Sequence, residues 1–389
     1  HPTINDNCPE IKTREALFTE IESEFKKNQN KTTVFVLHHP LYTNGVHGGK
    51  FAIDKHLFPS QKKIPLPVLA SLVQLIRTSG GVSSQDNMNK QYKKLVNRLE
   101  TLSKATTAGN IVFASGHEHS IQYIEHDGLK QIVSGSGAKN SYATLGNDGL
   151  FAYAGQGFAR LDIFNDGSSQ VSYYGATSGT PELLFVSEVF PEKKKFNIDT
   201  LPAINYQTKE ASVYETKETD KTELYEGLWG EFYRELYGTK IKAKVALLDT
   251  LYGGLEVVRK GGGHQTRSLR LKDKQGREYN MRALKKSSVL FLQSILFKES
   301  YVAESLENTV PEDILEDFYT ASHPYGFLAV PHLSKTLGIY HTNPQLFYIP
   351  KQKALGDYNT DYGDELYMIV ERPEDGHDEK ESFGKPDDI

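Results

Sequence analysis

Two short apolar runs, each followed closely by histidines, constrain the fold of this chain more than any other feature of its sequence. The first run, Thr33–Leu37, ends at His38, and the second, Asn110–Ala114, is followed after two small residues by His117 and then His119. Short apolar runs bounded by polar loops are typical of buried β-strands. Imidazole is the commonest neutral metal ligand, and loops on a rigid scaffold often carry catalytic groups. The sequence therefore predicts that histidines gather at the ends of two strands.

The order of these groups resembles the last two metal-binding motifs of the calcineurin-like metallophosphoesterases. One motif is a strand followed by His-x-Pro, here His38-His-Pro, and the other is a strand followed by Gly-His-x-His, here Gly-His117-Glu-His119. The resemblance implies that His38 and His117 bind one metal ion and that His119 binds another. It places His39 in the variable position between ligand and proline, where a hydrogen-bonding or packing role is expected.

His47 is the catalytic candidate that the same resemblance provides. It lies where the similar purple acid phosphatase-type enzymes place a histidine that faces the substrate, and Gly48 and Gly49 follow it. A His-Gly-Gly turn can present an imidazole and backbone N–H groups to a phosphate. A structural role for His47 in its loop remains open as the alternative. His1, His56 and His126 are expected to be surface or core histidines.

The resemblance also implies cofactors and partners. Two metal ions about 3.5–4 Å apart can hold a hydroxide in line with phosphorus, so two divalent or trivalent ions (zinc, iron or manganese) are expected in the complete domain. The family carries Asp-x-His, Gly-Asp-x-x-(Asp/Tyr) and Gly-Asn-His motifs ahead of these two, and the residues before His38 contain none of them. The chain is therefore expected to be the second half of such a domain, with at most one weakly bound ion. The N-terminal half and a phosphoester are the expected partners.

The secondary-structure signals favour an α+β fold class, with residues 1–189 as the C-terminal half of a metallophosphoesterase domain. Asp127-Gly128, between apolar alternating runs, predicts a β-hairpin, and residues 150–186 are expected to add two or three strands. A helix, a strand, a histidine loop and a run of strands is the order of the second half of a metallophosphoesterase β-sandwich with flanking helices. An amphipathic helix that begins at the cap Thr13 is expected over residues 13–28, and further helices are expected over residues 67–77 and 90–104.

The rest of the chain is expected to form a smaller α+β domain over residues 223–372, after a linker over 190–222 and before a charged tail over 373–389. In this domain a glycine cluster at 261–263, a hairpin, Lys286 and an acidic helix follow the order of a protein kinase small lobe. No kinase catalytic-loop motif follows in the sequence. A binding or scaffold domain is therefore favoured over a phosphotransferase that uses Lys286.

Composition excludes several classes of protein. A formal net charge of −5 over 389 residues gives no sign of the excess positive charge that is typical of nucleic-acid-binding proteins. No apolar run approaches the roughly 18 residues of a membrane-spanning helix. Cys8 is the only cysteine, so an internal disulfide is excluded and an ordinary thiol is expected.

A wider resemblance covers nearly the whole chain. Long bacterial envelope proteins that join a calcineurin-like domain to a kinase-lobe-like region and an outer-membrane barrel are similar in the runs around His38, His117, Gly262, His323 and His341. This resemblance implies the bacterial envelope, periplasm or outer membrane as the location, and outer-membrane barrel or assembly proteins as partners. The leading hypothesis is a metal-dependent phosphoester hydrolase of which this chain is an incomplete part. The alternative is a non-catalytic docking or scaffold module of an outer-membrane assembly.

Overall fold

The computed structural model describes residues 11–28, 31–59, 64–79, 83, 85–106, 110–176, 179–261, 263, 265–306 and 309–372. The chain divides into two compact units, His1–Lys193 with Lys298–Tyr301, and Lys194–Phe297 with Val302–Ile389. Both units mix helices and strands, which confirms the α+β class. His1, Cys8, Gly262 and the expected tail over 373–389 lie outside the described residues.

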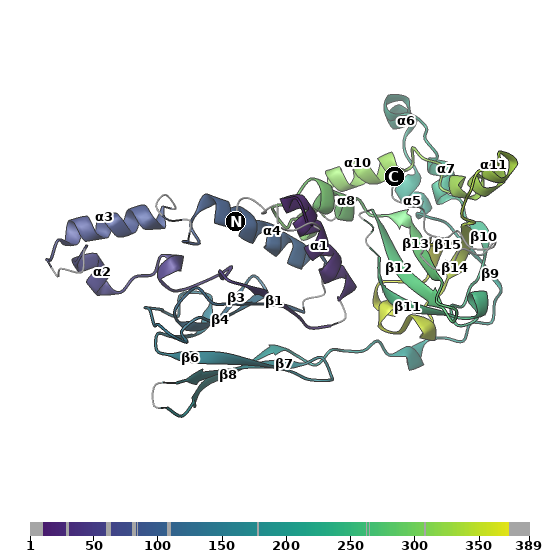
Figure 1. Ribbon diagram of the computed structural model, residues 1–389. Coiled ribbons are helices and arrows are strands. Elements are labelled where there is room, and N and C mark those ends of the chain that lie inside the picture. The colour runs from purple at the N-terminus through teal and green to yellow at the C-terminus, as the bar shows by residue number, and fades with distance from the viewer. Residues whose placement is uncertain are drawn as a thin grey trace. The chain divides into compact units, whose positions relative to one another are not determined.

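The first unit is built on a five-stranded mixed sheet (Figure 1). Its strands are β1 (Thr33–Leu37), β2 (Ile111–Ser115), β3 (Ile121–His126), β4 (Leu129–Ser134) and β5 (Gly149–Tyr153). Their order is β1-β2-β4-β3-β5, in which β1, β2 and β4 are parallel and β3 is antiparallel to β4 and β5. The β3–β4 hairpin turns at Asp127 and Gly128, which both have positive φ, as the sequence predicted.

Two amphipathic helices, α1 (Arg14–Lys27) and α4 (Lys90–Thr106), cover one face of this sheet. Phe25 from α1, Leu99 from α4 and Phe113 from β2 belong to one buried core cluster. The hydroxyl of Thr13 accepts a hydrogen bond from the backbone N–H of Ala16 at 3.0 Å, so Thr13 is the N-cap that the sequence predicted. These helices bury the side chains that leave one face of β1 and β2.

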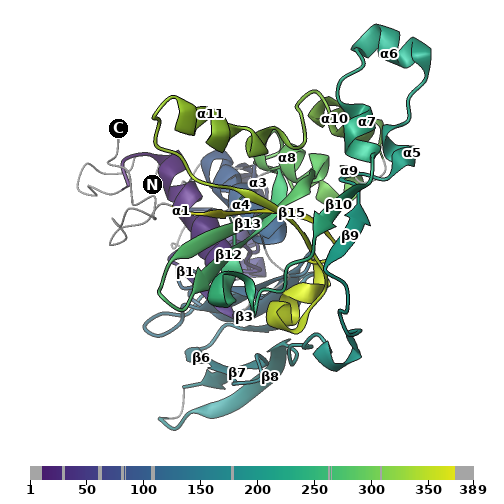
Figure 2. The ribbon, with the colours of Figure 1, turned by 90° about the vertical axis from the view of Figure 1, so that its right-hand side faces the viewer.

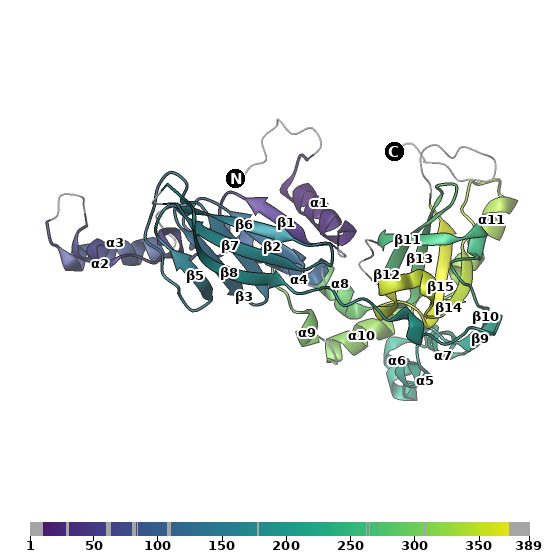
Figure 3. The same cartoon turned by 90° about the horizontal axis from the view of Figure 1, so that it is seen from below.

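The opposite face packs on a second, antiparallel sheet of three strands, β6 (Gly157–Ile163), β7 (Ser169–Gly175) and β8 (Glu182–Phe190). Val112 and Tyr123 from the first sheet share a buried cluster with Val171 and Tyr173 from the second. The hydroxyl of Tyr173 donates to the backbone carbonyl of Gln122 at 2.6 Å. The first unit is therefore a two-layered β-sandwich with helices on its outer face; Figure 1 shows these layers from the side, and in Figure 3 the two sheets overlap in the view.

The segment between β1 and α4 contains the short helix η1 (Val46–Gly48) and the helices α2 (Ile53–Leu57) and α3 (Pro67–Thr78). α3 confirms the helix predicted over 67–77 and begins at Pro67, a residue that suits the first turn of a helix. Its apolar side chains stay largely exposed, up to 84% for Val68. Among the described residues, no helix is long and apolar enough to cross a membrane.

The second unit contains a five-stranded antiparallel sheet in the order β11-β12-β13-β15-β14. Leu269, Met281, Ile349, Tyr367 and Ile369 are fully or almost fully buried in its core. The strands are β11 (Leu255–Lys260), β12 (Thr266–Asp273), β13 (Glu278–Lys286), β14 (Gln345–Ile349) and β15 (Glu365–Glu371), and the helices are α5 (Thr216–Thr219), α6 (Glu223–Trp229), α7 (Arg234–Gly238), α8 (Ser288–Ile295), α9 (Ala303–Leu306), α10 (Val310–Tyr319) and α11 (Val330–Thr336). Short 3₁₀ segments lie at η2 (Ile198–Thr200), η3 (Leu251–Gly253) and η4 (Gly326–Leu328), and a longer one lies at η5 (Lys353–Thr360).

Part of the linker expected over residues 190–222 forms secondary structure of the second unit, whereas residues 191–197 and 201–207 lie outside the helices and strands. The strand β9 (Thr208–Ala211) pairs with β10 (Ile241–Lys244), and the two lie side by side in Figure 2. Val213 and Tyr214 are buried in a core cluster of that unit. This strand could not be predicted from the sequence because its side chains are mostly polar and exposed. Its pairing depends on backbone hydrogen bonds, which require no alternating apolar residues. The division between the units falls at Lys193 and not at residue 189.

Candidate metal centre

Three histidines meet at the carboxyl ends of the parallel strands β1 and β2. His38 and His39 follow β1 directly, and His117 lies two residues after the end of β2. Leu37 pairs with Ser115 at the last position of the ladder, so both loops leave the sheet at the same edge. One ring nitrogen from each of the three histidines lies within 4.8 Å of the other two.

His117 makes the central contacts of this group. Its ring centroid lies 3.9 Å from that of His39, 4.2 Å from that of His47 and 5.0 Å from that of His38. Its Nδ1 is 3.2 Å from Nε2 of His38, and its Nε2 is 3.2 Å from the backbone carbonyl oxygen of Gln85. Because the carbonyl accepts the proton on Nε2, Nδ1 keeps the lone pair that a metal ion would need.

Burial favours the neutral form of His117 and of His39. Burial, reinforced by the neighbouring His47 and His39, lowers the pKa of His117 to about 4. Burial and then the adjacent His38 and His47 also lower the pKa of His39 from its ordinary value. A histidine binds a metal ion through a deprotonated nitrogen, so the low pKa of His117 favours binding at pH 7.

The backbone at His117 is strained. Its φ of 60° lies in the left-handed region, which costs a residue other than glycine roughly 1–2 kcal/mol. The loop is tightened by hydrogen bonds from the Glu118 N–H to the Gly116 carbonyl at 2.7 Å and from the Ser120 N–H to the Glu118 carbonyl at 2.8 Å. Residues held in such conformations cluster at functional sites, where the surrounding structure maintains the strain.

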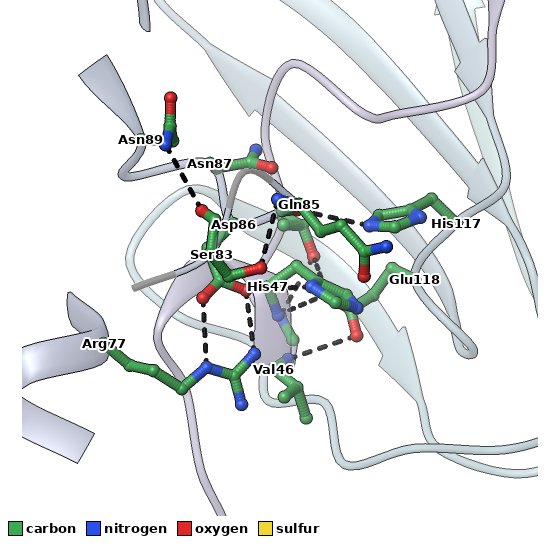
Figure 4. A network of polar contacts seen from close by, with 12 residues as sticks. Val46, His47, Arg77, Ser83, Gln85, Asp86, Asn87, Asn89, His117 and Glu118 are labelled. Carbon is green, nitrogen blue, oxygen red and sulfur yellow. Dashed lines mark hydrogen bonds and ion pairs between the residues drawn. The ribbon is translucent and has the colours of Figure 1, made fainter. Parts of the chain in front are cut away.

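His47 is oriented by a carboxylate that is itself held by an arginine (Figure 4). Nδ1 of His47 lies 3.0 Å from Oδ1 of Asp86, and Arg77 donates to both oxygens of Asp86 at 2.8 and 3.0 Å. Burial alone would raise the pKa of Asp86, but the hydrogen bonds from Arg77 and His47 outweigh it and lower that pKa. The ionised carboxylate accepts the Nδ1 proton of His47 and leaves Nε2 free for a proton or a ligand.

Glu118, between the two histidines of the second motif, is fully buried. Its carboxylate accepts hydrogen bonds from the backbone N–H groups of Val46 and His47 at 3.1 and 2.9 Å. The hydroxyls of Thr43 and Ser141 donate to it as well, each at 3.1 Å. Glu118 therefore connects the His47 loop to the loop after β2, and Figure 4 shows its hydrogen bonds to the His47 loop.

The cluster contains His39, expected to pack or to hydrogen-bond, beside the His38 and His117 that the resemblance assigns to one ion. His119, which the resemblance assigns to another ion, does not belong to the cluster, and its role as a ligand stays a prediction. The backbone carbonyl of His119 accepts from the N–H of Ser141 at 2.6 Å. His38, His117 and His47 lie together, as the motifs predicted, although His47 contacts His117 by its ring and not as part of the three-nitrogen group.

The donor set suits one ion and not two. Three imidazoles with an open fourth position are a common zinc arrangement, and the 3.2 Å between the His38 and His117 nitrogens is near the roughly 3.3 Å edge of a tetrahedron with bonds of about 2.0–2.1 Å. Within the described residues, no carboxylate belongs to the cluster. Asp86 is occupied by Arg77, and Glu118 by backbone donors. A binuclear centre therefore does not fit these residues alone.

The kinase-like arrangement in the second unit is not assembled around Lys286. Its Nζ lies 5.0 Å from the ring centroid of Tyr319, and burial lowers the pKa of this lysine. The described part of the chain shows no ion pair between Lys286 and a carboxylate, whereas Lys285 pairs with Glu218 at 3.0 Å. This geometry gives no support to a phosphotransferase site.

Comparisons with known proteins assign this chain to no family. No family model matches the chain, and no curated protein matches it. One solved structure, GAP50, described as the anchor in the inner membrane complex of Plasmodium, aligns at a TM-score of 0.31 and 17% identity. The alignment covers 49% of this chain and 47% of that one, so the chain spans about half the length of the structure that it matches. At this TM-score the likeness establishes no shared fold.

Three residues of the site were missed by reading the sequence. Glu118 lies within the Gly-His-Glu-His motif and could have been noticed as a charged residue in a strand-end loop. Asp86 and Arg77 carry no such signal, because the polar stretch around Asp86 resembles an ordinary loop and Arg77 an ordinary last turn of a helix. Their role follows only from the fold, which brings residues from separate segments to His47.

Proposed function

We propose that the first unit carries the metal site of a metal-dependent phosphoester hydrolase. The observation that supports this most is the meeting of His38, His39 and His117 at one edge of the sheet, with the ring of His47 packed against that of His117. A divalent ion bound there would supply Lewis-acid activation of water or of a phosphoryl oxygen.

The chain's own residues have separate tasks in this proposal. His38, His39 and His117 bind the ion through neutral imidazole nitrogens. His47 faces the substrate, and its Nε2 exchanges a proton or binds a phosphate oxygen because Asp86 occupies Nδ1. Arg77 keeps the Asp86 carboxylate in place. A second ion would need carboxylate or amide ligands from residues outside those described, such as the N-terminal half that the resemblance implies.

A non-catalytic docking module is the second candidate, and two observations favour it. The cluster in the described residues contains no carboxylate, which a binuclear hydrolase would use. The helix α3 exposes Val68, Leu72 and Leu75 at 84%, 48% and 65%, a surface typical of protein contact. In this reading the histidines hold a structural ion or none.

Zinc binding tests the proposed ligand set residue by residue. Equilibrium dialysis of the full chain, followed by elemental mass spectrometry, should give about one zinc ion per chain. A His117→Gly variant should lose the ion, because the imidazole is removed while glycine tolerates the positive φ. A His119→Ala variant is the matched control and should keep it.

Loss of zinc in His119→Ala but not in a His39→Ala variant would restore the ligand set implied by the resemblance. Absence of zinc in the unmodified chain would contradict the metal site itself. Hydrolysis of p-nitrophenyl phosphate by the natural full-length protein, lost in His47→Ala, is expected for the hydrolase. Stoichiometric metal without turnover would favour the docking module.

A further inference from the structure

Arg270, in the middle of β12, has a guanidinium group that is partly enclosed and has no acceptor. Its Nε and Nη1 atoms are buried, and neither has a hydrogen-bond partner among the described residues. Its Nη2 atom is not enclosed in this way, so a ligand can reach the group from that side. Donors that leave water without finding an acceptor cost free energy, and those of a charged group cost more. An added acceptor would therefore stabilise this guanidinium.

Arg234, in α7 of the same unit, shows the opposite arrangement. This side chain is almost fully buried, and its Nε and Nη2 donate to the two carboxylate oxygens of Asp317 at 2.6 and 2.7 Å. Its Nη1 donates to the backbone carbonyls of Gly230 and Glu231. Each nitrogen of that guanidinium has an acceptor, as is usual for an arginine enclosed in a protein. The second unit therefore satisfies Arg234 and leaves the donors of Arg270 without acceptors from its described residues.

The strands beside Arg270 place further arginines around it. Arg270 pairs with Arg259 of β11 on one side and with Asn280 of β13 on the other. Arg282 lies two residues after Asn280, so its side chain leaves the same face of the sheet. Burial, and then the charges of Arg372 and Arg259, lower the pKa of Arg270 to about 10. Like charges directly opposite one another in a sheet repel, so this face concentrates positive charge at a cost in stability.

The carboxylate nearest to this group is already engaged. Glu278 accepts a hydrogen bond from Nη1 of Arg372 at 2.8 Å. In the part of the chain that the structure describes, no carboxylate forms an ion pair with Arg259, Arg270 or Arg282. The positive charge at the centre of this face is therefore not neutralised by the described side chains.

We propose that Arg270, with Arg259 and Arg282 beside it, is a binding site for an oxyanion, a phosphate or carboxylate group. Two oxygens of such a group match the planar fork of donors that a guanidinium presents. An anion fits better than a neutral ligand, because it accepts from the unpaired donors and also offsets the repulsion between the arginines. This inference does not depend on the metal site, which belongs to the first unit.

Two sources supply this chemistry. One is a phosphate group on a separate molecule. The other is the chain itself, since the sequence after β15 is acidic, although residues 373–389 lie outside the described residues. Val370 of β15 pairs with Asn280, the partner of Arg270, so the chain leaves the sheet two strands away from this site. The first acidic residues of that segment are Glu374, Asp375, Asp378, Glu379 and Glu381.

Inorganic phosphate is the probe that tests the site on the full chain, at constant ionic strength so that charge screening does not change. The chain has one tryptophan, Trp229, which lies in α6 of the second unit, so its fluorescence follows the unfolding of that unit. Phosphate in excess over its Kd should raise the urea midpoint seen by Trp229, because a ligand that binds only the folded state stabilises it. Nitrogen-15 NMR should show phosphate shifting the Nε–H signal of Arg270 and leaving that of Arg234, which is paired with Asp317.

Two matched variants on β12 locate the effect. Arg270→Met removes the charge, keeps an unbranched side chain and should weaken phosphate binding by about tenfold or more. Without phosphate this variant should unfold at the same or a higher urea concentration than the unmodified chain, because an unpaired charge is lost. Arg267→Met is the control, since Arg267 is exposed and pairs with Glu365 at 3.0 Å, and it should keep the phosphate-dependent shift.

A variant in which the five acidic residues Glu374 to Glu381 become Gln or Asn distinguishes the two sources. If the chain's own carboxylates occupy the site, phosphate should bind this variant about tenfold more tightly than it binds the unmodified chain. If the anion comes from a separate molecule, the two forms should have equal Kd values. Either result supports the site and identifies its source. A phosphate-dependent shift that persists in Arg270→Met, or no shift in both the unmodified and the neutralised chain, would overturn the proposal.

Discussion

At the residue scale, one buried carboxylate connects the two histidine loops. Glu118 is fully buried and accepts hydrogen bonds from two backbone N–H groups of the His47 loop and from two hydroxyls. A buried charge is tolerated only when such donors compensate its lost hydration. A Cβ built on Gly45 would lie 2.3 Å from Cδ of Glu118, so this position has no room for a larger side chain.

Replacing this carboxylate should destabilise the first unit strongly. In a Glu118→Gln variant the amide group would face the N–H groups of Val46 and His47, and buried donors would lose their acceptor. We expect the free energy of unfolding to fall by about 3 kcal/mol in urea titrations. Glu125→Gln is the control, because Glu125 is exposed and pairs with Lys130 at the surface; a loss under about 1 kcal/mol is expected. Equal effects of the two substitutions would contradict the structural role of Glu118.

At the scale of elements, the end of α3 is tied to the His47 loop through Asp86. Arg77 from the last turn of α3 donates two hydrogen bonds to Asp86, which also accepts from His47. The N–H of Asn87 donates to the His47 carbonyl at 2.9 Å, and its side-chain amide donates to the Pro40 and Leu41 carbonyls at 3.0 Å. Segments distant in sequence therefore orient the imidazole of His47 together.

This connection predicts a pH-dependent contribution to stability. The pKa of Asp86 is lowered in the folded chain, so its carboxylate stabilises the fold above the unfolded pKa of about 3.9, and this contribution disappears as the pH falls through the folded value. The difference in unfolding free energy between the unmodified chain and Asp86→Asn should be present at about pH 7 and should shrink towards about pH 3. Denaturant titrations across this range measure it.

The control for this prediction is Asp54→Asn on the exposed surface of α2, which should change stability by less than about 0.5 kcal/mol at either pH. A constant difference for Asp86→Asn over the whole range would show that the charge of Asp86 is not what stabilises the loop.

At the scale of the whole molecule, the two units have separate cores, and the histidine cluster belongs to the first. The only tryptophan, Trp229, lies in α6 of the second unit. Its fluorescence therefore reports the unfolding of the second unit, whereas far-ultraviolet circular dichroism reports both. A ligand that binds only the folded first unit should stabilise that unit alone.

Zinc should therefore raise the unfolding temperature of the first unit and leave that of the second unit unchanged. With zinc at about a hundred times its Kd, the first unit should gain about 2.7 kcal/mol, seen as a shifted transition in circular dichroism. The Trp229 transition should stay in place, and in His117→Gly neither should move. A zinc-induced shift of the Trp229 signal would contradict a site confined to the first unit.

Local patterns in the sequence were enough to predict much of the fold. The apolar runs, the Thr13 cap and the Asp127-Gly128 turn predicted β1, β2, α1 and the β3–β4 hairpin, because spacing, capping and turn chemistry act over a few residues. The gathering of histidines at strand ends follows from the same patterns, since parallel neighbouring strands end at one edge of a sheet.

Only the tertiary structure decided which side chains meet. The positive φ of His117 and the hydrogen bonds of Glu118 set the direction of the loop, and they bring His39 and not His119 into the cluster. Backbone pairing made a strand of the polar segment Thr208–Ala211, which was expected in a linker. In each case the deciding contacts join residues far apart in the sequence, or depend on a backbone conformation that residue types alone do not specify.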